Sequence, residues 1–408
     1  MSALWPYDGS CDFTTLSNSG WAPQPINEFI FKVQSRCNLN CDYCYVYNLG
    51  DDSWKSAPSV MSEEVAGAAA VRIRRHAEAH GLRGVGISIH GGEPLLRGVE
   101  PIERFVTIVK SHLAQLEVEV SMQTNATLVT DDIAQRLHAL DIHVGVSLDG
   151  DLEANSHRLD RRGRSSYRRV VAGIERLSRY PGLIQGGLAV IDLRNDPVSV
   201  YETVRNLGIT SLDVLLPHST WDALPDGKNG DRSLSAASPY GDWLKELYDH
   251  WSAQQDRIRL RIFDDILHLL LGGTYSFESL GLAPAQLVTI EANGDIELVD
   301  SIGFTYGGAA ETGANVLRDD IDAVLRHPGV VCRQIGLEAL PQVCRSCEVV
   351  DICGGGLISH RFDSESGFKN QTVYCSDMRS LIRHINTDLD QRIAILQEHR
   401  MSVGAQRG

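Results

Sequence analysis

Short apolar runs alternate with amphipathic segments between residues 27 and 217. Six runs are rich in branched residues and bounded by turn signals, at residues 29–33, 84–89, 117–122, 143–148, 187–191 and 212–216. After the first run, Ser62 precedes a segment with helical spacing that carries Glu63 and Glu64 in its first turn and stops at Gly81, which predicts a capped helix. Strands that alternate with helices predict parallel pairing with right-handed crossovers. Six such units are fewer than the eight of a closed barrel, so we expect an α/β fold built as a TIM-like (β/α)6 partial barrel.

The composition changes after residue 224. Residues 225–239 are rich in Gly, Asp, Asn and Ser, which is typical of a loop or lid. Residues 240–271 carry apolar side chains at the spacing of two helices. We therefore expect five parts: a tail at 1–25, the partial barrel at 26–224, a loop with bridging helices at 225–280, a C-terminal domain at 281–385, and a helix and tail at 386–408.

Composition and charge narrow the possible partners. The chain has 408 residues, 43% of them hydrophobic, without an apolar run of about 18 residues or a basic N-terminal segment followed by an apolar one. We therefore expect a cytoplasmic protein without a membrane partner. A net charge of -15 and the lack of a basic stripe argue against nucleic acid. Nine cysteines, clustered at the two ends of the chain, favour metal ligation in a reducing compartment over disulfides.

Three of these cysteines follow the first predicted strand. Cys37, Cys41 and Cys44 have the pattern C-x3-C-x2-C. Three thiolates can bind three irons of a [4Fe-4S] cluster and leave the fourth iron open for a small ligand. A structural zinc site normally has four closed ligands. The compact triplet therefore favours an open catalytic cluster over a zinc knuckle or three unrelated cysteines.

Glycine and small polar residues follow the next three predicted strands. The second strand runs into His90-Gly91-Gly92-Glu93, the third ends in Gln123-Thr124-Asn125, and the fourth ends in Ser147-Leu148-Asp149-Gly150. Binding sites in parallel sheets form at the C-terminal ends of strands. These side chains suit contacts to a ribose or a carboxylate, although each motif taken singly is as typical of a turn.

A second cysteine group lies near the C-terminus. It reads Cys344-x2-Cys347-x5-Cys353, and the distant Cys375 adds a fourth thiol. Four thiolates satisfy either zinc or an iron-sulfur cluster, so the spacing alone leaves both open. Cys11 and Cys332 belong to neither group, and we expect them to be buried as small hydrophobic residues.

The cysteine triplet and the Gly-Gly-Glu motif resemble those of the radical S-adenosylmethionine (SAM) superfamily. The resemblance implies that the open iron chelates the amino and carboxylate groups of SAM, and that reductive cleavage, with an electron from a reductant such as flavodoxin or ferredoxin, yields a 5'-deoxyadenosyl radical. It assigns SAM contacts to Tyr43, Gly91, Gly92, Glu93, Gln123, Asn125, Ser147, Asp149 and Arg158. The loop after the fourth strand aligns ambiguously, so Arg161 is an alternative to Arg158.

The second cysteine group resembles the SPASM domain, an auxiliary-cluster module of radical SAM peptide-modifying enzymes. Typical SPASM domains use seven cysteines for two clusters, but this chain has Val299 and Leu357 at two of those positions and no cysteine before Gly294. The remaining set is complete for the second auxiliary cluster: Cys344, Cys347, Cys353 and Cys375. We therefore expect two [4Fe-4S] clusters, one that binds SAM and one auxiliary.

Asp300 is the candidate catalytic residue. It follows Val299 directly, and sulfatase-maturing relatives carry a catalytic aspartate after the corresponding cysteine. A general base must lie within hydrogen-bonding reach of the proton that it removes. A hairpin that faces the barrel mouth would place Asp300 there, whereas a solvated hairpin would place it in water, and the sequence leaves both open.

From about residue 27 to residue 385 the chain is similar to the FxsB-like group of cyclophane-forming radical SAM/SPASM peptide maturases. The similarity is carried by CNLNCDYCYVYNLGDDSWKSAPSVMS, HGGEPLLRG, GRSSYRRV and CRSCEVVDICGGGLISHRF. It implies a ribosomally made precursor peptide as substrate and a C-C crosslink between an aromatic ring and a Cβ as product. The adenosyl radical would remove a Cβ hydrogen, the carbon radical would add to the ring, and one electron and one proton would then leave. Asp300 is the predicted acceptor of the proton and the auxiliary cluster that of the electron.

Other functions also fit the motifs. The same scaffold can form a thioether or ether crosslink or epimerise a residue. The chain can also mature a sulfatase, although the lost first auxiliary cluster weighs against this. A non-enzymatic electron carrier or metal-stapled binding module is a further alternative, against which the SAM-type strand ends weigh.

Overall fold

One twisted sheet runs through the computed structural model, which describes residues 11–274 and 279–405. Within these residues the sheet has ten strands in the order β10-β9-β8-β1-β2-β3-β4-β5-β6-β7. The pairs from β8 to β7 are parallel, whereas β8-β9 and β9-β10 are antiparallel. The strands are β1 (Glu28–Gln34), β2 (Gly84–Gly91), β3 (Glu117–Thr124), β4 (Ile142–Ser147), β5 (Ile184–Val190), β6 (Ser211–Leu215), β7 (Arg259–Leu260), β8 (Leu287–Ile290), β9 (Asp295–Glu297) and β10 (Glu311–Asn315).

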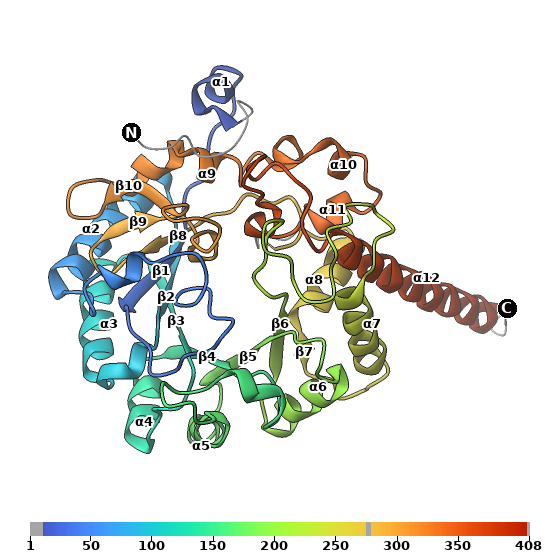
Figure 1. Ribbon diagram of the computed structural model, residues 1–408, viewed down its shortest axis with the longest axis horizontal. Coiled ribbons are helices and arrows are strands. Elements are labelled where there is room, and N and C mark those ends of the chain that lie inside the picture. The colour runs from blue at the N-terminus through green and yellow to red at the C-terminus, as the bar shows by residue number, and fades with distance from the viewer. Residues whose placement is uncertain (1–10, 275–278, 406–408) are drawn as a thin grey trace.

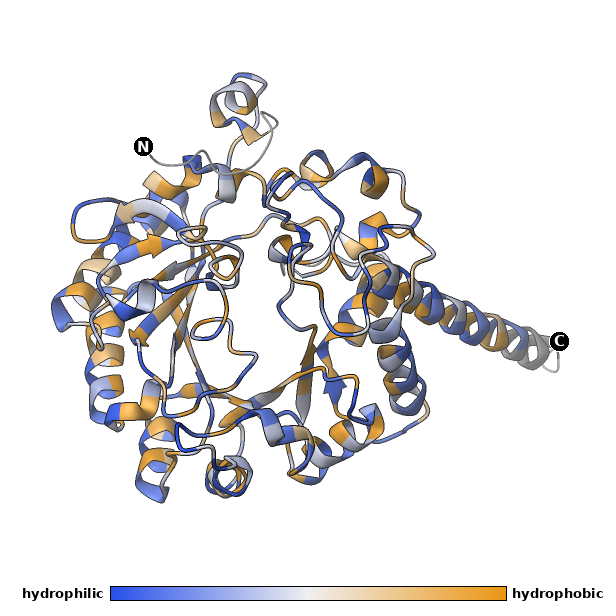
Figure 2. Ribbon diagram, viewed as in Figure 1, coloured by the Kyte–Doolittle hydropathy of each residue, from blue (hydrophilic) through white to orange (hydrophobic). Residues whose placement is uncertain are grey.

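Helices cover the outside of the curved parallel part of the sheet (Figure 1). Strands β1 to β6 with their crossover helices form the open (β/α)6 partial barrel, so the predicted fold class is confirmed. The apolar side of each crossover helix packs on the strands, and hydrophilic residues occupy the outer side (Figure 2). The crossover helices are α2 (Glu63–His80), α3 (Glu100–His112), α4 (Asp131–Ala139), α5 (Tyr167–Leu177) and α6 (Pro197–Asn206).

Local signals fix the ends of these elements as expected. The Ser62 hydroxyl accepts a hydrogen bond from the Val65 amide at 3.2 Å, and Gly81 ends α2 at a φ of 66°. Such a cap satisfies an amide that would otherwise lack an intrahelical partner. Strand β5 begins at Ile184, earlier than the expected residue 187, because glycines 186 and 187 lie inside the strand and hide its start.

The C-terminal hairpin continues the barrel sheet. Strand β8 pairs in parallel with β1, and β9 and β10 follow it at the sheet edge. The predicted boundary at residue 281 therefore falls within a region whose strands share one sheet with the barrel. The remaining helices are α1 (Phe13–Asn18), α7 (Pro239–Ser252), α8 (Arg261–Leu270), α9 (Pro328–Val331), α10 (Gln342–Arg345), α11 (Val350–Cys353) and α12 (Cys375–Ala405).

The two bridging helices that we expected within residues 240–271 are α7 and α8. Helix α7 packs against α12, which crosses the predicted boundary at residue 386 and projects from the body (Figure 1). The segment predicted as a loop or lid has no helix or strand over residues 225–238, yet Lys228 ties it down. The Lys228 Nζ atom lies 2.6 Å from Oδ2 of Asp377, and both side chains are buried. This part of the loop is therefore anchored to the start of α12.

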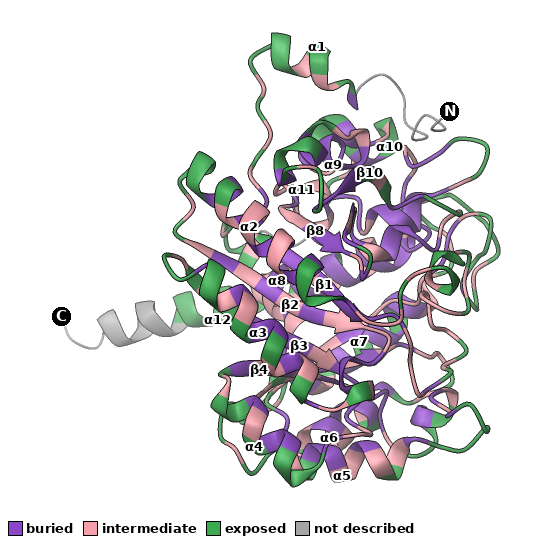
Figure 3. Cartoon of the chain, turned by 90° about the vertical axis from the view of Figure 1, so that its left-hand side faces the viewer, coloured by how far each residue is buried: buried purple, intermediate pink, exposed green. Residues whose placement is uncertain are grey.

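Buried positions lie along the strands of the sheet and on the crossover helices (Figure 3). Among the residues that the structure describes, no helix combines the length and the apolar content needed to cross a membrane. The first part of the predicted tail (1–10), residues 275–278 of the bridging segment and residues 406–408 of the C-terminal tail lie outside the described residues.

Candidate active site

The cysteine triplet lies in the loop directly after β1. The Cys44 amide donates to the Cys41 carbonyl at 3.1 Å, and the Asn48 amide donates to the Cys44 carbonyl at 2.8 Å. Burial raises the pKa of Cys37 to about 12 and that of Cys41 to about 11, so both thiols are protonated without a metal. A bound metal ion displaces such protons and holds the thiolates. The loop thus presents three thiols close together along one short stretch of chain.

The Gly-Gly-Glu motif sits against the loop that leaves β1. A Cβ atom on Gly91 would lie 2.2 Å from the Gln34 carbonyl oxygen, and one on Gly92 would lie 2.5 Å from that of Arg36. The Gly92 amide donates to the Gln34 carbonyl at 2.7 Å. Both glycines are therefore required for the close approach of two backbone segments, in addition to any contact with SAM.

Glu93 is fully buried and bonded to its neighbours. Its carboxylate accepts hydrogen bonds from the Leu95 amide at 3.1 Å, the Thr124 hydroxyl at 2.7 Å and the Asn125 amide at 2.8 Å. The predicted role of Glu93 in SAM binding stays a prediction. The structure adds a second role, because this carboxylate joins the ends of β2 and β3.

Tyr43, Asp149 and Arg158 form one buried cluster. The Tyr43 hydroxyl donates to Asp149 Oδ2, and Arg158 Nη1 donates to the Tyr43 oxygen at 2.8 Å. Arg161, the alternative to Arg158, is exposed and donates to the Cys37 carbonyl at 3.1 Å. The two arginines thus differ in place, with Arg158 beside the strand-end residues and Arg161 on the outside of the cysteine loop.

The remaining predicted SAM contacts bond to their neighbours at the same face of the sheet. Gln123 Nε2 donates to the Ser147 hydroxyl at 2.8 Å, and Asn125 Nδ2 donates to Asn38 in the cysteine loop at 2.9 Å. A pocket of about 890 Å³ opens beside Tyr43 and Asp149. The structure therefore brings the predicted strand-end residues together around the cysteine triplet.

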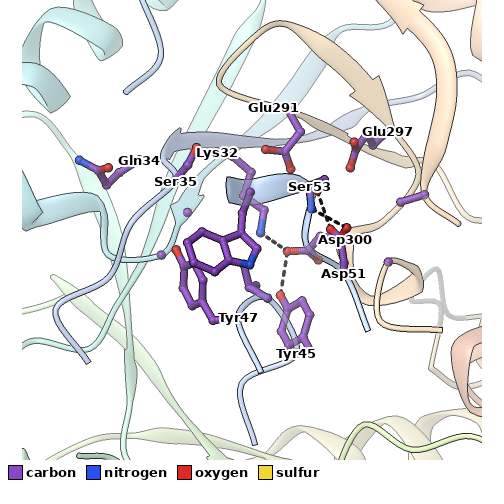
Figure 4. Close-up of a pocket in the computed structure, with 16 residues that line it drawn as sticks. Lys32, Gln34, Ser35, Tyr45, Tyr47, Asp51, Ser53, Glu291, Glu297 and Asp300 are labelled. Carbon is purple, nitrogen blue, oxygen red and sulfur yellow. Dashed lines mark hydrogen bonds and ion pairs between the residues drawn. The ribbon is translucent and has the colours of Figure 1, made fainter. Parts of the chain in front are cut away.

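Asp300 lies inside the barrel mouth, not in solvent. It begins a short 3-10 helix, η5 (Asp300–Ile302), and its side chain is only 11% exposed. The Lys32 Nζ atom is 2.5 Å from Oδ2 of Asp300, and the Tyr45 hydroxyl donates to the same oxygen at 2.7 Å (Figure 4). The His90 Nδ1 atom lies 3.8 Å from that oxygen. Of the two placements that the sequence left open, the hairpin facing the barrel is the one observed.

The charges around Asp300 set its protonation. Burial acts to raise the pKa of Asp300, but the Lys32 ammonium, His90 and the hydrogen bonds outweigh it and hold that pKa well below its usual range. Burial raises the pKa of Glu291, and burial together with repulsion from Glu291 raises that of Glu297. Asp300 is therefore a stable anion, and the two glutamates beside it favour the protonated form.

A pocket of about 510 Å³ lies beside Asp300, between β1, the cysteine loop and the C-terminal hairpin. Lys32, Tyr45, Glu291 and Glu297 line it together with Asp300 (Figure 4). A second hollow of about 740 Å³ shares both glutamates and continues along the hairpin.

The second cysteine group is assembled from separate segments. Cys344, Cys347, Cys353 and Cys375 line one apolar pocket. Thiolates on one tetrahedral zinc, at about 2.3 Å from the metal, lie only about 3.8 Å apart. Among the described cysteines, no three sulfur atoms lie within 4.8 Å of one another. This spacing is wider than that of a tetrahedral zinc site, at this set and at the triplet.

The two remaining cysteines are buried as expected. Cys11 and Cys332 are each 3% exposed, and a hydrogen bond from Cys11 helps burial to raise the pKa of Cys332. The two cysteines therefore pack together, although they are far apart in the sequence.

One further group has metal-ligand residue types, His76, His80 and Asp322. The Ile26 amide donates to His76 Nε2 at 3.0 Å, so the ring proton is on Nδ1, which faces Asp322. A metal-bound histidine normally donates its second ring nitrogen rather than accepting there. We interpret this group as a structural hydrogen-bond cluster.

Sequence reasoning missed several residues of the site. Lys32, Tyr45, His90 and Glu291 surround Asp300, and Asn38 joins the cysteine loop to β3. One signal was available: Lys32 is a charged residue inside the apolar run 29–33, and lysine is almost never fully buried unless it is paired. Nothing in the local sequence identified its partner, which is 268 positions away along the chain.

Comparisons with known proteins agree with this site. The family model described as the radical SAM superfamily matches residues 31–191. The chain is 24% identical over 366 residues to a cysteine-type anaerobic sulfatase-maturating enzyme of Clostridium perfringens, covering 88% of this chain and 96% of that protein. It is 22% identical to a serine-type enzyme of Bacteroides thetaiotaomicron, covering 90% and 91%. An uncharacterized protein of Methanocaldococcus jannaschii is 30% identical over 234 residues, 54% of this chain and 75% of that protein.

Solved structures show the same fold. The structure of anSMEcpe with bound AdoMet and Cp18Cys peptide superposes with a TM-score of 0.74 at 22% identity, over 91% of this chain and 100% of that one. Streptococcus suis SuiB bound to its precursor peptide SuiA gives 0.58 at 16% identity, over 89% and 78%. The predicted cofactors, SAM and [4Fe-4S] clusters, are confirmed as those of this type of enzyme. The assignment of the two cysteine groups as cluster ligands stays a prediction. The chain belongs to the radical SAM superfamily.

Proposed function

We propose that this enzyme modifies a ribosomally synthesised precursor peptide by forming a cyclophane, a C-C crosslink between an aromatic ring and a Cβ. The observation that carries the proposal is the buried Asp300 carboxylate at the mouth of the barrel, in a pocket that Lys32, Tyr45, Glu291 and Glu297 also line. Solved relatives hold peptides, Cp18Cys in anSMEcpe and SuiA in SuiB, which supports a peptide substrate here. The crosslink itself rests on the likeness to FxsB-like maturases.

The chain's own residues would act on the peptide as follows. When bound, SAM and its cluster supply a 5'-deoxyadenosyl radical that removes a Cβ hydrogen, and the auxiliary cluster accepts one electron after the ring is attacked. Asp300 is the proposed first acceptor of the proton that leaves as the ring regains aromaticity. The Lys32 ammonium and the Tyr45 hydroxyl hold this carboxylate in place. A reductant such as flavodoxin or ferredoxin would supply the electron that starts the reaction.

Sulfatase maturation is the second candidate, and the relatives of Clostridium perfringens and Bacteroides thetaiotaomicron favour it. The cysteine count favours the crosslink. Val299 and Leu357 stand where a first auxiliary cluster would need thiolates, so only one auxiliary set is complete. Thioether or ether crosslinking and epimerisation remain alternatives on the same scaffold.

Product mass separates these reactions. We would reconstitute the enzyme anaerobically and supply SAM, reductant and the peptide encoded by a neighbouring small open reading frame. A crosslink removes two hydrogens and joins two residues in tandem mass spectra, whereas epimerisation changes no mass. A sulfatase-type product carries an aldehyde that a hydrazide reagent captures. An unmodified mass, or an aldehyde in place of a crosslink, would refute the proposed function.

A further inference from the structure

Three histidines have a buried ring nitrogen without a hydrogen-bond partner. These atoms are Nδ1 of His90, Nδ1 of His218 and Nε2 of His360. Buried polar atoms without a partner are uncommon in folded proteins, and each one calls for a physical reason. His90 Nδ1 lies 3.8 Å from Oδ2 of Asp300, so the nearby carboxylate accounts for its position. His218 and His360 have no such explanation.

Aromatic contacts connect these two histidines to Asp300. His218 follows β6, and its ring centroid lies 4.6 Å from that of Tyr45 and 5.7 Å from that of His360. The Tyr45 hydroxyl in turn donates to Asp300. Phe304 packs on the His218 ring at 4.8 Å and shields it. A continuous series of rings therefore leads from Asp300 to His360.

The far end of this series reaches the auxiliary cysteines. His360 lies in a short 3-10 helix, η8 (Ile358–Arg361), which packs against η5, the helix that Asp300 begins. The next residue, Arg361, donates to the carbonyls of glycines 354, 355 and 356 at 2.9, 3.0 and 2.7 Å. These glycines directly follow Cys353. The two histidines thus bridge the site and the auxiliary loop.

Both rings are neutral at pH 7. Burial lowers the pKa of His218 to about 4, against the opposing effect of Asp300. Burial, followed by His218 and Arg361, lowers the pKa of His360 well below its ordinary value. A neutral imidazole has one N-H and one lone pair, so it can accept a proton at one nitrogen and release one from the other.

We propose that His218 and His360 form a proton relay that carries the proton released by the peptide from Asp300 towards the auxiliary-cluster domain. The inference rests on the proposed oxidative modification, in which the peptide loses one hydrogen atom to the adenosyl radical, then one proton and one electron. The proton passes through the two rings and leaves to solvent. Each ring ends neutral but as the other tautomer, and proton exchange with water restores the first tautomer before the next turnover. One water molecule can bridge the gap between the rings.

The need for a relay follows from the charge on Asp300. Because its pKa is held well below its usual range, a proton that it receives cannot stay there. The protonated carboxyl would also lose its attraction to the buried Lys32 ammonium. The neutral imidazole of His218, which packs on the Tyr45 ring that bonds to Asp300, is the proposed base that removes the proton.

Imidazole rescue of His218→Ala tests the relay in the holoenzyme. With a peptide deuterated at Cβ, deuterium should still enter 5'-deoxyadenosine, while crosslinked product per 5'-deoxyadenosine falls by about 10²-fold, the lower end of the range for proton-transfer help. Free imidazole should restore part of the product by entering the vacated space. His218→Phe keeps the packing on Tyr45 and should show the same loss without rescue. His112→Ala, on the exposed end of α3, is the control and should match the wild type.

Two results would overturn the proposal. One is unchanged product per 5'-deoxyadenosine in His218→Ala. The other is a parallel fall of product and 5'-deoxyadenosine that imidazole does not reverse, which indicates a structural role. A separate measurement does not depend on turnover: ¹⁵N-histidine NMR of the full chain should show the pKa of His360 rising in His218→Phe, because a repelling neighbour is gone. An unchanged pKa would mean that the rings are uncoupled.

These outcomes are distinct from failure of the proposed function. If the wild type removes no hydrogens from the peptide, the crosslinking proposal is wrong and the relay has no proton to carry from substrate. The NMR coupling would then still decide whether the two rings share protons. If the wild type forms the crosslink and both His218 variants do so equally well, only the relay is wrong.

Discussion

The two cysteine groups offer the same kind of metal ligand, a thiol, but in different surroundings. Cys37, Cys41 and Cys44 come from one loop and lie beside the strand ends of the barrel. The second group combines cysteines of residues 344–353 with Cys375, which begins α12. Three thiolates leave one iron open for a substrate-like ligand, whereas four close the cluster. If both groups bind clusters as proposed, the number of protein ligands separates a cluster that does chemistry on SAM from one that transfers electrons.

Their surroundings match this division. The triplet faces the polar cluster of Tyr43, Asp149 and Arg158 and a pocket of about 890 Å³. The pocket of the second group is apolar, and its loop is braced by Arg361. Polar strand ends suit the binding of a charged cofactor. A closed apolar site suits a cluster that only gains and loses electrons.

The largest effect is expected from removing the triplet. With Cys37, Cys41 and Cys44 replaced by Ala, SAM cleavage should be lost, because no iron is left to chelate SAM. Iron content should fall from about eight to about four atoms per chain, since the second set is intact. Iron analysis and 5'-deoxyadenosine assays measure both. Wild-type iron near twelve atoms, or four with one zinc, would contradict the assignment of the two groups.

Breaking the second group should separate SAM cleavage from crosslinking. Cys347→Ala should keep the triplet cluster and form 5'-deoxyadenosine, but yield no crosslinked peptide, because the electron has no acceptor. Metal ligation also stabilises such domains, so thermal unfolding and circular dichroism must show that the variant is folded. Normal crosslinking by a folded variant would assign this cluster a purely structural role.

Asp300→Asn should leave both clusters in place and affect only the proton transfer that follows hydrogen abstraction. The amide keeps the shape but cannot accept a proton, so crosslinking should fall by about 10²- to 10⁴-fold while SAM cleavage continues. Product and 5'-deoxyadenosine are measured together. The variant also leaves Lys32 buried without its counter-ion, so the matched control combines Asp300→Asn with Lys32→Met. If the double variant regains crosslinking, the loss came from the unpaired lysine and not from a missing base.

The smallest effect is expected from substituting Glu93, which lies on the side of the cysteine triplet. Glu93→Ala should weaken SAM binding by roughly 1.5–3 kcal/mol if its carboxylate meets the ammonium group. The structure adds that three donors would lose their acceptor, which costs about 1–3 kcal/mol of stability when they stay buried. SAM titration and thermal unfolding separate the two effects. Lower stability with unchanged SAM affinity would make Glu93 a residue that only joins β2 and β3.

Local sequence patterns were enough to predict the repeated strand-helix architecture and to propose the metal ligands. Helix caps such as Ser62, the apolar runs of the parallel strands and the C-x3-C-x2-C spacing each act over a few residues, and short-range sterics and hydrogen bonds determine them. The order of strands β1 to β6 followed because crossovers in such units have one hand. The choice of residues for SAM followed from the resemblance of the motifs, and the structure gathers those residues at one face.

Only the tertiary structure decided how distant residues meet. The pairing of β8 with β1 brings Asp300 to Lys32, and a hairpin signal in the sequence does not encode that partner. The contact of His218 with His360 and the burial of Arg158 depend on the same path of the chain. Ion pairs and ring contacts between residues far apart arise from the packing of whole elements. The sequence by itself therefore determined the radical SAM family and the residues proposed as cluster ligands, and the fold alone determined the surroundings that keep Asp300 charged and the path proposed beyond it.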